Sequence, residues 1–192
     1  HIEHNLPYDQ IFQVVVDRYM AVEINLGVDV DLTMHLDKIR ENLKKNPSAD
    51  YIASRGEYLN AILVAAFLGY DFVDTADLIK FDNKGKILIE ETDRLLREEL
   101  TKHERAVLPG FYGSTLDGEI RTFSRGGSDI TGALVARAIK ADVYENWTDV
   151  SGFLVADPRI VKNPKQIKTI SYKELRELSY ICLLYTSDAA DD

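Results

Sequence analysis

The chain is organised around the stretch Thr122-Phe123-Ser124-Arg125-Gly126-Gly127-Ser128-Asp129. This stretch places an arginine, two adjacent glycines, hydroxyls and a carboxylate directly before residues 130–140, whose apolar positions recur at helical spacing. The first N–H groups of a helix have no partner within the helix and can bind an anion. The pattern predicts an anion-binding loop that leads into a helix. Taken alone, a Gly-Gly turn before a helix is a weak signal, and a plain loop at a sheet edge explains it about as well.

Three amphipathic helices are predicted upstream, over residues 7–20, 31–45 and 49–70. The third contains the pair Gly56-Glu57. A glycine inside a helix costs about 1 kcal/mol relative to alanine, so its presence suggests close approach by another backbone or by a ligand. The pattern leaves open whether Glu57 faces a site or solvent. His35 lies off the apolar stripe of the second helix, and we expect it to be a solvated surface histidine.

Strands and helices alternate through the middle of the chain. Short strands are predicted at 71–80 and 87–90, then a helix at 91–103 and a buried strand at 106–108, which delivers the loop 110–113. A further strand is predicted at 142–147, and a capping-box pattern, Ser171 to Glu174, predicts the start of another helix. This alternation is typical of an open, mainly parallel α/β sheet, in which ligands bind beyond the carboxyl ends of the strands.

Composition narrows the classes of function. The chain has 192 residues, 45% of them hydrophobic, and a net charge of -9, which argues against a general nucleic-acid-binding surface. No apolar run approaches the roughly 18 residues that span a bilayer, and no signal peptide is recognisable, so we expect a cytoplasmic protein without a membrane partner. Cys182 is the single cysteine, and the four histidines lack metal-ligand spacing, so no protein-bound structural metal is expected.

The loops at residues 110–129 and 147–159 contain the residue types that phosphoryl transfer needs. They offer the arginines Arg125 and Arg159, glycine turns, hydroxyls, and the carboxylates Asp129 and Asp149. Catalysis of phosphoryl transfer consists mainly of positioning and charge neutralisation by backbone N–H groups, cationic side chains and a metal ion. The residues fit that chemistry without specifying it.

The chain resembles the aspartate kinase family of the amino acid kinase superfamily in three motifs. These are Arg125-Gly126-Gly127-Ser128-Asp129, Trp147-Thr148-Asp149-Val150 and Asp157-Pro158-Arg159. The resemblance covers about residues 7–180 and is most specific from 109 to 159. It implies a three-layer α/β/α sandwich, the amino acid kinase fold, here incomplete at both ends. It also implies transfer of the γ-phosphoryl group of MgATP to the side-chain carboxylate of L-aspartate.

The resemblance further implies roles for single residues on the aspartate side. Arg125 would pair with a substrate carboxylate as a bidentate fork, which lysine could not replace equally well. Glu57 would accept the substrate ammonium group, Phe111 would wall the aspartate site, and Ser128 would hydrogen-bond the substrate. Asp129 would organise the catalytic cations, so Arg125 and Asp129 are the expected catalytic pair.

On the nucleotide side, the resemblance implies that Thr148 and Asp149 meet the adenosine and that Arg159 lies near the phosphates. The family often has a tyrosine just before the Asp-Pro-Arg turn, whereas this chain has Leu154. Each of these residues also has a structural explanation, such as a turn cap for Asp149 or a surface ion pair for Arg159.

The two ends of the chain depart from the family pattern. The family's first strand and its Lys-Phe-Gly-Gly-Ser-Ser loop have no counterpart here, and residues 181–192 match neither the family nor a structural pattern. We therefore expect a catalytic domain at 1–180, an artefactual or disordered tail at 181–192, and a poorly active isolated chain. The parent protein is expected to form a homo-oligomer through regulatory domains.

Three other functions remain open at this point. The chain could belong to another member of the superfamily that acts on a different small acid or a nucleotide. It could be a non-catalytic module for oligomerisation or effector binding. It could also be the kinase half of a bifunctional protein that carries a homoserine dehydrogenase.

Overall fold

The structure is a computed structural model, and it describes residues 8–45, 47–124, 126–147, 154–156, 160–171 and 173–174. The chain separates into two compact units, residues 1–144 and 145–192. The first unit contains every helix and strand named below, and each unit is described by itself.

The first unit begins with three helices, α1 (Asp9–Leu26), α2 (Leu32–Leu43) and α3 (Ala49–Leu68). All three predicted helices are confirmed, although α1 runs six residues further than expected and ends at Gly27 in the left-handed conformation. The apolar stripe of α2 is buried against α1 and α3, as its spacing indicates. This first core contains Phe12, Leu32, Leu36, Ile39, Leu43, Leu59 and Leu63.

In the described part of the chain, five short strands form two small sheets. Strand β1 (Asp71–Phe72) pairs in parallel with β3 (Ala106–Val107). In the second sheet, β2 (Lys80–Phe81) pairs in parallel with β4 (Tyr112–Thr115), which pairs antiparallel with β5 (Ile120–Thr122). The mainly parallel sheet is therefore confirmed, whereas the β4–β5 hairpin was not predicted.

Two predicted strands need correction, the first in its middle only, because its ends form β1 and β2. The segment 71–80 is broken by the short helix α4 (Thr75–Leu78), because the Asp74 side chain accepts a hydrogen bond from Ala76 N and caps that helix. The segment 87–90 contributes only a bridge between Ile87 and Phe81, since helix α5 (Ile89–Leu100) has already begun.

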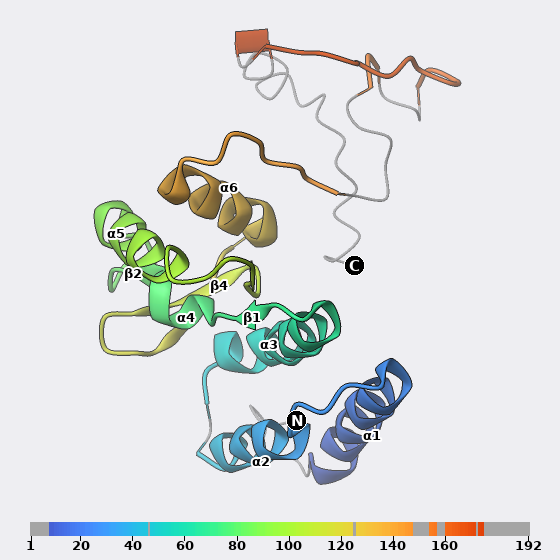
Figure 1. Cartoon of the computed structure of the whole chain (residues 1–192), viewed down its shortest axis with the longest axis vertical. Coiled ribbons are helices and arrows are strands. Elements are labelled where there is room, and N and C mark those ends of the chain that lie inside the picture. Colours follow the sequence, from blue (N-terminus) through green and yellow to red (C-terminus); the bar gives the residue numbers. More distant parts are fainter. Residues whose placement is uncertain are drawn as a thin grey trace. The chain divides into compact units, whose positions relative to one another are not determined.

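The strands lie between layers of helices (Figure 1). Helix α5 and helix α6 (Gly127–Ile139) cover one side of the strands, and α3 covers the other, with α1 and α2 packed on the outer side of α3. A second core joins the sheet to α5 and α6 through Val73, Leu78, Ile79, Phe81, Leu96, Leu134 and Ala138. The layers expected of an α/β/α sandwich are present.

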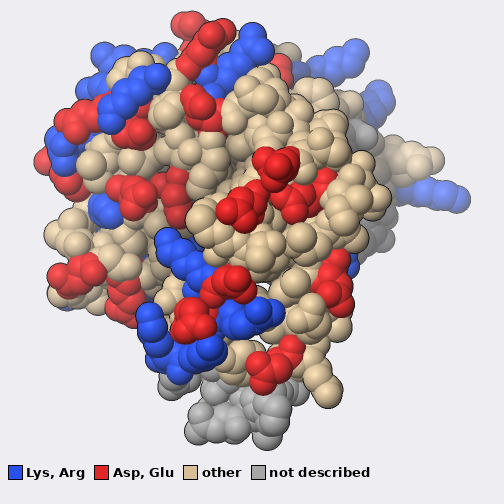
Figure 2. Space-filling view, turned by 60° about the horizontal axis from the view of Figure 1, so that its bottom comes forward, with Lys and Arg blue, Asp and Glu red and all other residues tan. Residues whose placement is uncertain are grey.

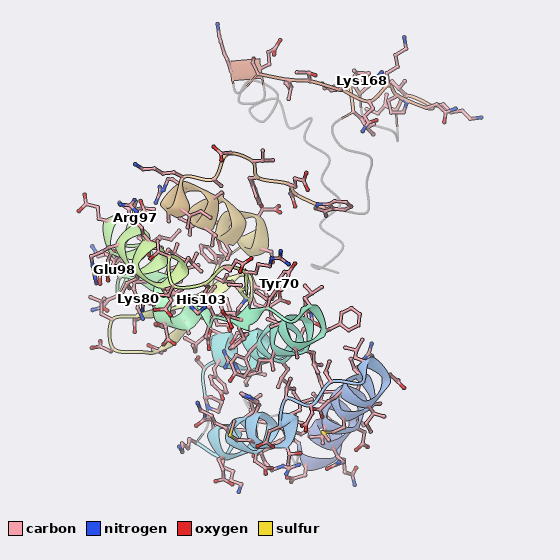
Figure 3. The ribbon with its side chains drawn as sticks, viewed as in Figure 1. Tyr70, Lys80, Arg97, Glu98, His103 and Lys168 are labelled. Atoms are coloured by element: carbon pink, nitrogen blue, oxygen red, sulfur yellow. The ribbon has the colours of Figure 1, made fainter. Side chains whose placement is uncertain are left out.

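One histidine ties α5 to the sheet (His103, labelled in Figure 3). Its Nδ1 lies 2.7 Å from Asp71 Oδ2 at the start of β1, and its Nε2 lies 3.2 Å from Glu99 Oε1 on α5. Hydrogen bonds that the ring donates to the carboxylates of Asp71 and Glu99 raise the pKa of this histidine above its ordinary value. The bridge fixes the turn between α5 and β3 against the edge of the sheet.

The segment after α6 corrects a third predicted strand. Residues 142–147 are exposed and take no part in a β-ladder in the described part of the chain. The hydroxyl of Tyr144 instead packs against Gly132 of α6. This part of the chain therefore packs on a helix and does not extend a sheet.

In the second unit, the capping box is confirmed. Ser171 N and Ser171 Oγ donate to Glu174 Oε2 at 2.9 and 2.6 Å, and Glu174 N donates back to Ser171 Oγ at 3.3 Å.

Candidate functional site

The loop before α6 depends on its two glycines. Gly126 has a φ of 60°, in the left-handed region where glycine is favoured. Gly127 is buried, and a Cβ at this position would lie 2.7 Å from Phe111 Cα. The second glycine therefore lets the start of α6 approach the backbone of the loop after β3.

That loop, residues 109–111, is bonded directly to α6. Phe111 has a φ of 55°, and its N–H donates to Thr131 Oγ1 at 3.2 Å. The Thr131 hydroxyl in turn donates to Gly127 O at 2.8 Å, so one side chain satisfies groups on both segments. Phe123 N donates to Phe111 O at 2.9 Å and closes the loop from its other side. Thr131 was missed by the sequence reasoning, although its position four residues after Gly127 is the spacing at which a threonine reaches a helical carbonyl.

Glu57 reaches this loop from α3. Its Oε1 accepts a hydrogen bond from Gly110 N at 3.3 Å, and a Cβ on Gly110 would lie 2.7 Å from Ser128 Oγ. Residues from α3, from the loop after β3 and from the start of α6 thus meet at one point. Glu57 is half-buried and contacts this loop rather than pointing into bulk solvent.

These residues line a pocket of about 430 Å³. Its polar side holds Glu57, Gly110, Ser128 and Thr131, and its apolar side includes Leu108 and Val135. A pocket that combines apolar walls with a few converging polar groups is the usual form of a small-molecule site.

Burial and carboxylates near the pocket raise the pKa values of two neighbouring tyrosines. Burial raises the pKa of Tyr144, and the neighbouring charge of Asp129 raises it further. On the α3 side, burial and then the charge of Glu57 raise the pKa of Tyr19, whose hydroxyl donates to Gly56 O at 2.8 Å. The close approach by a backbone or ligand that was expected at Gly56 is not found, because a Cβ there would meet only the Tyr19 hydroxyl, at an ordinary contact distance of 3.5 Å.

The structure brings together part of the predicted site. Glu57 and Ser128 share the pocket, Phe111 belongs to the loop that forms its edge, and Asp129 follows Ser128 on the exposed first turn of α6. Four predicted residues lie outside the described part of the chain: Arg125, Thr148, Asp149 and Arg159.

His35 corrects another expectation. It is half-buried rather than solvated, and its Nδ1 lies 2.8 Å from the hydroxyl of Tyr58. Burial, followed by the charge of Lys38, lowers its pKa.

Within the described residues, no group of three or more His, Cys, Asp or Glu side chains is arranged to hold a metal ion. In the same residues, no helix is both long enough and apolar enough to cross a membrane.

Comparisons with known proteins agree on one family. Residues 15–190 match the amino acid kinase family. The chain is 36% identical to aspartokinase 3 of Bacillus subtilis over 89% of this chain and 41% of that protein. It is 33% identical to the aspartokinase of Rickettsia bellii over 83% of this chain and 42% of that protein. The chain thus spans about two-fifths of the length of the curated relatives it matches.

Solved structures give the same result. The crystal structure of Clostridium acetobutylicum aspartate kinase superposes with a TM-score of 0.85 and 48% identity, over 94% of this chain and 42% of that one. Aspartokinase III of E. coli, solved with aspartate and ADP, shares the fold at a TM-score of 0.72 and 24% identity, over 88% of this chain and 42% of that one. With its layered α/β architecture and a family match over most of its length, the chain belongs to the amino acid kinase family.

Proposed function

We propose that the protein transfers the γ-phosphoryl group of MgATP to the side-chain carboxylate of L-aspartate. The observation that carries the proposal is the meeting of Glu57, Gly110 and Ser128 in one pocket at the start of α6. The names of the relatives at 36% and 48% identity, aspartokinase and aspartate kinase, support aspartate as the substrate.

In this proposal the amino acid is held by opposite charges. Glu57 binds the substrate ammonium group, and because its Oε1 is oriented by Gly110 N, its position is set before the substrate arrives. Arg125 pairs with a substrate carboxylate through two parallel hydrogen bonds. Ser128 hydrogen-bonds the substrate, and Phe111 forms a wall of the site.

The transfer itself needs little covalent chemistry from the protein. Negative charge spreads over the phosphoryl oxygens in the transition state, so catalysis consists of alignment and charge stabilisation. The first N–H groups of α6, which have no partner within the helix, stabilise such charge in this proposal. Asp129 organises the cations that accompany the nucleotide, while Thr148, Asp149 and Arg159 bind the adenosine and phosphates. The metal ion that accompanies ATP supplies further charge neutralisation.

The first test is binding of L-aspartate to the 192-residue chain in the presence of MgATP, measured by calorimetry. Glu57→Gln keeps a carbonyl oxygen for Gly110 N but removes the charge, so we expect affinity for L-aspartate to fall about tenfold or more, the effect of losing one charge-assisted hydrogen bond. Arg125→Lys keeps the charge but removes the fork, and it should also weaken binding.

The matched control is Glu98→Gln, which removes the same charge from the exposed surface of α5 (Figure 3). It should leave affinity unchanged. Formation of the acyl phosphate is followed separately, by trapping with hydroxylamine. Tighter binding of L-glutamate or UMP than of L-aspartate would instead assign the protein to another activity of the superfamily.

A further inference from the structure

A second pocket of about 430 Å³ lies between α2, α3 and the turn of the β4–β5 hairpin. Its lining includes Lys38, Asn42, Lys45, Tyr51 and Arg55. No residue lines both this pocket and the one beside Glu57. Arg55 and Glu57 are two positions apart on α3, and side chains at that spacing project from different faces of a helix.

Arg55 is held in this pocket by aromatic rings. Its guanidinium carbon lies 4.7 Å from the ring centroids of both Tyr51 and Tyr58, and 5.3 Å from that of Tyr112. Its Nε and Nη2 donate to Ser54 Oγ at 3.1 and 2.9 Å. Contacts of this kind fix a guanidinium without neutralising it, so the arginine is oriented while its charge stays available.

The cations of the pocket have no acid partner. Among the described residues, Lys38, Lys45 and Arg55 form no ion pair within 4.0 Å. Lys45 Nζ donates to the amide oxygen of Asn42 at 3.4 Å. Three positive side chains thus converge on one cavity without a carboxylate bonded to any of them.

The two carboxylates in the lining are engaged elsewhere. Asp74 Oδ1 accepts hydrogen bonds from the Tyr112 hydroxyl at 2.8 Å and from Ala76 N at 3.0 Å. Glu119 pairs with Arg121 at 3.2 Å. Among the described residues, neither acid forms an ion pair with Lys38, Lys45 or Arg55, and the charge of Glu119 is balanced by Arg121.

This local excess of positive charge is unusual for the molecule as a whole. The chain has a net charge of -9, and basic and acidic side chains are interspersed on the face drawn in Figure 2. A general attraction for anions is excluded by that distribution, so any anion bound here is recognised by the pocket itself. The lowered pKa of His35, caused first by burial and then by Lys38, is consistent with a positive local field.

We propose that this pocket binds a small, multiply charged oxyanion, such as a phosphate group or a dicarboxylate. Arg55 supplies a fixed guanidinium, which binds the anion through the N–H groups that do not donate to Ser54. Lys38 and Lys45 supply flexible charges at the rim, and Asn42 and Tyr51 offer polar edges. Planar oxyanions and phosphates match the donor geometry of a guanidinium, which explains why an arginine rather than a lysine is held between the rings.

The test is a titration of the ¹⁵N-labelled chain with inorganic phosphate, and separately with malonate, at constant ionic strength. We expect saturable shifts of the Arg55 Nε–H signal and of the backbone amides of Ser48 and Gly118, which line the pocket. Lys38→Gln should raise the dissociation constant about fivefold, because it removes one partly exposed charge-assisted contact. Arg55→Lys should weaken binding more, although the net charge is unchanged.

Lys84→Gln is the control, since it removes the same charge from an exposed turn outside the pocket. Saturation by phosphate or by malonate, with loss in Lys38→Gln but not in Lys84→Gln, supports the proposal and identifies which oxyanion is preferred. Shifts that do not saturate, equal effects of the two lysine variants, or shifts confined to residues 126–129 would overturn it. The last outcome would leave the proposed aspartate site intact.

Discussion

Gly127 is the single residue on which the geometry of the candidate site depends most directly. We predict that Gly127→Ala destabilises the chain by about 1–3 kcal/mol, the usual range for overpacking. The new methyl group would lie 2.6 Å from Phe111 Cβ and 2.7 Å from Phe111 Cα, so the loop and the helix must separate. The free energy of unfolding, measured by urea denaturation, checks the prediction.

Gly56→Ala is the matched control, because it also adds a methyl group to a helix of the site. Here the Cβ would meet only the Tyr19 hydroxyl at 3.5 Å, an ordinary contact. Replacement of a mid-helix glycine should then stabilise the chain by up to about 1 kcal/mol. Equal losses of stability in the two variants would contradict the close approach at Gly127.

Thr131 provides a second prediction for a single residue. Thr131→Val keeps the shape of the side chain but leaves Phe111 N without its acceptor, whereas Gly127 O keeps its helical backbone partner. We expect a loss of about 1–3 kcal/mol in the free energy of unfolding, because a buried donor becomes unsatisfied. Thr131→Ser restores the hydroxyl and should recover most of that loss, whereas a stable valine variant would show that the bond is dispensable.

For the secondary-structure elements, the bridge from α5 to β1 through His103 makes stability depend on pH. The folded pKa of His103 is raised by Asp71 and Glu99. Its contribution is therefore fully present below the unfolded pKa, about 6.5, and is lost as pH rises through the folded pKa. The difference in Tm between the wild type and His103→Gln should shrink from pH 5.5 to pH 8.5.

The contribution of His35 to stability depends on pH in the opposite direction, so His35 serves as the comparison. Its pKa is lowered, chiefly by burial, so protonation opposes folding. The Tm difference between the wild type and His35→Gln should shrink as pH falls through the folded pKa. Parallel trends for the two histidine variants would be incompatible with the two environments described above.

The elements also show what sequence alone can predict. The stripe of α2 was predicted correctly because burial on one face leaves a periodic pattern. The strand at 106–108 was correct in type and forms β3 at 106–107, but its residues are partly rather than fully buried. The break after Val73 was missed because a single capping carboxylate, Asp74, outweighs the β-propensity around it. The β4–β5 hairpin was missed because its turn, with Gly118 at a φ of 85°, was not recognised as a turn signal.

The candidate site was predicted only through residues that carry a motif. Glu57 and Ser128 could be singled out because a glycine or a Gly-Gly pair precedes each of them. The proximity of Glu57 and Ser128 in space could not be predicted, because it depends on how α3 packs against the loop after β3. The predicted role of every site residue stays a prediction, and four of these residues, Arg125, Thr148, Asp149 and Arg159, lie outside the described part of the chain.

The first unit as a whole contains two separate apolar cores, which predicts uneven stability. Leu36→Ala creates a cavity in the core of α1, α2 and α3, where Leu36 is 2% exposed. We expect a loss of about 2–5 kcal/mol and faster hydrogen exchange mainly in α1 and α2. Leu96→Ala should instead affect α5 and α6. Identical exchange patterns in the two variants, measured by mass spectrometry, would indicate one cooperative unit.

Helix α3 carries residues of both pockets within one uninterrupted helix, and this limits how the sequence can change. A residue inserted between Arg55 and Glu57 would rotate everything beyond it by about 100° and advance it by about 1.5 Å. Either the arginine would leave its three tyrosine rings or the glutamate would leave Gly110 N. Single substitutions can change Arg55 or Glu57 independently of each other. An insertion or a deletion between them is not tolerated, because the helix fixes the angle between the two side chains about its axis.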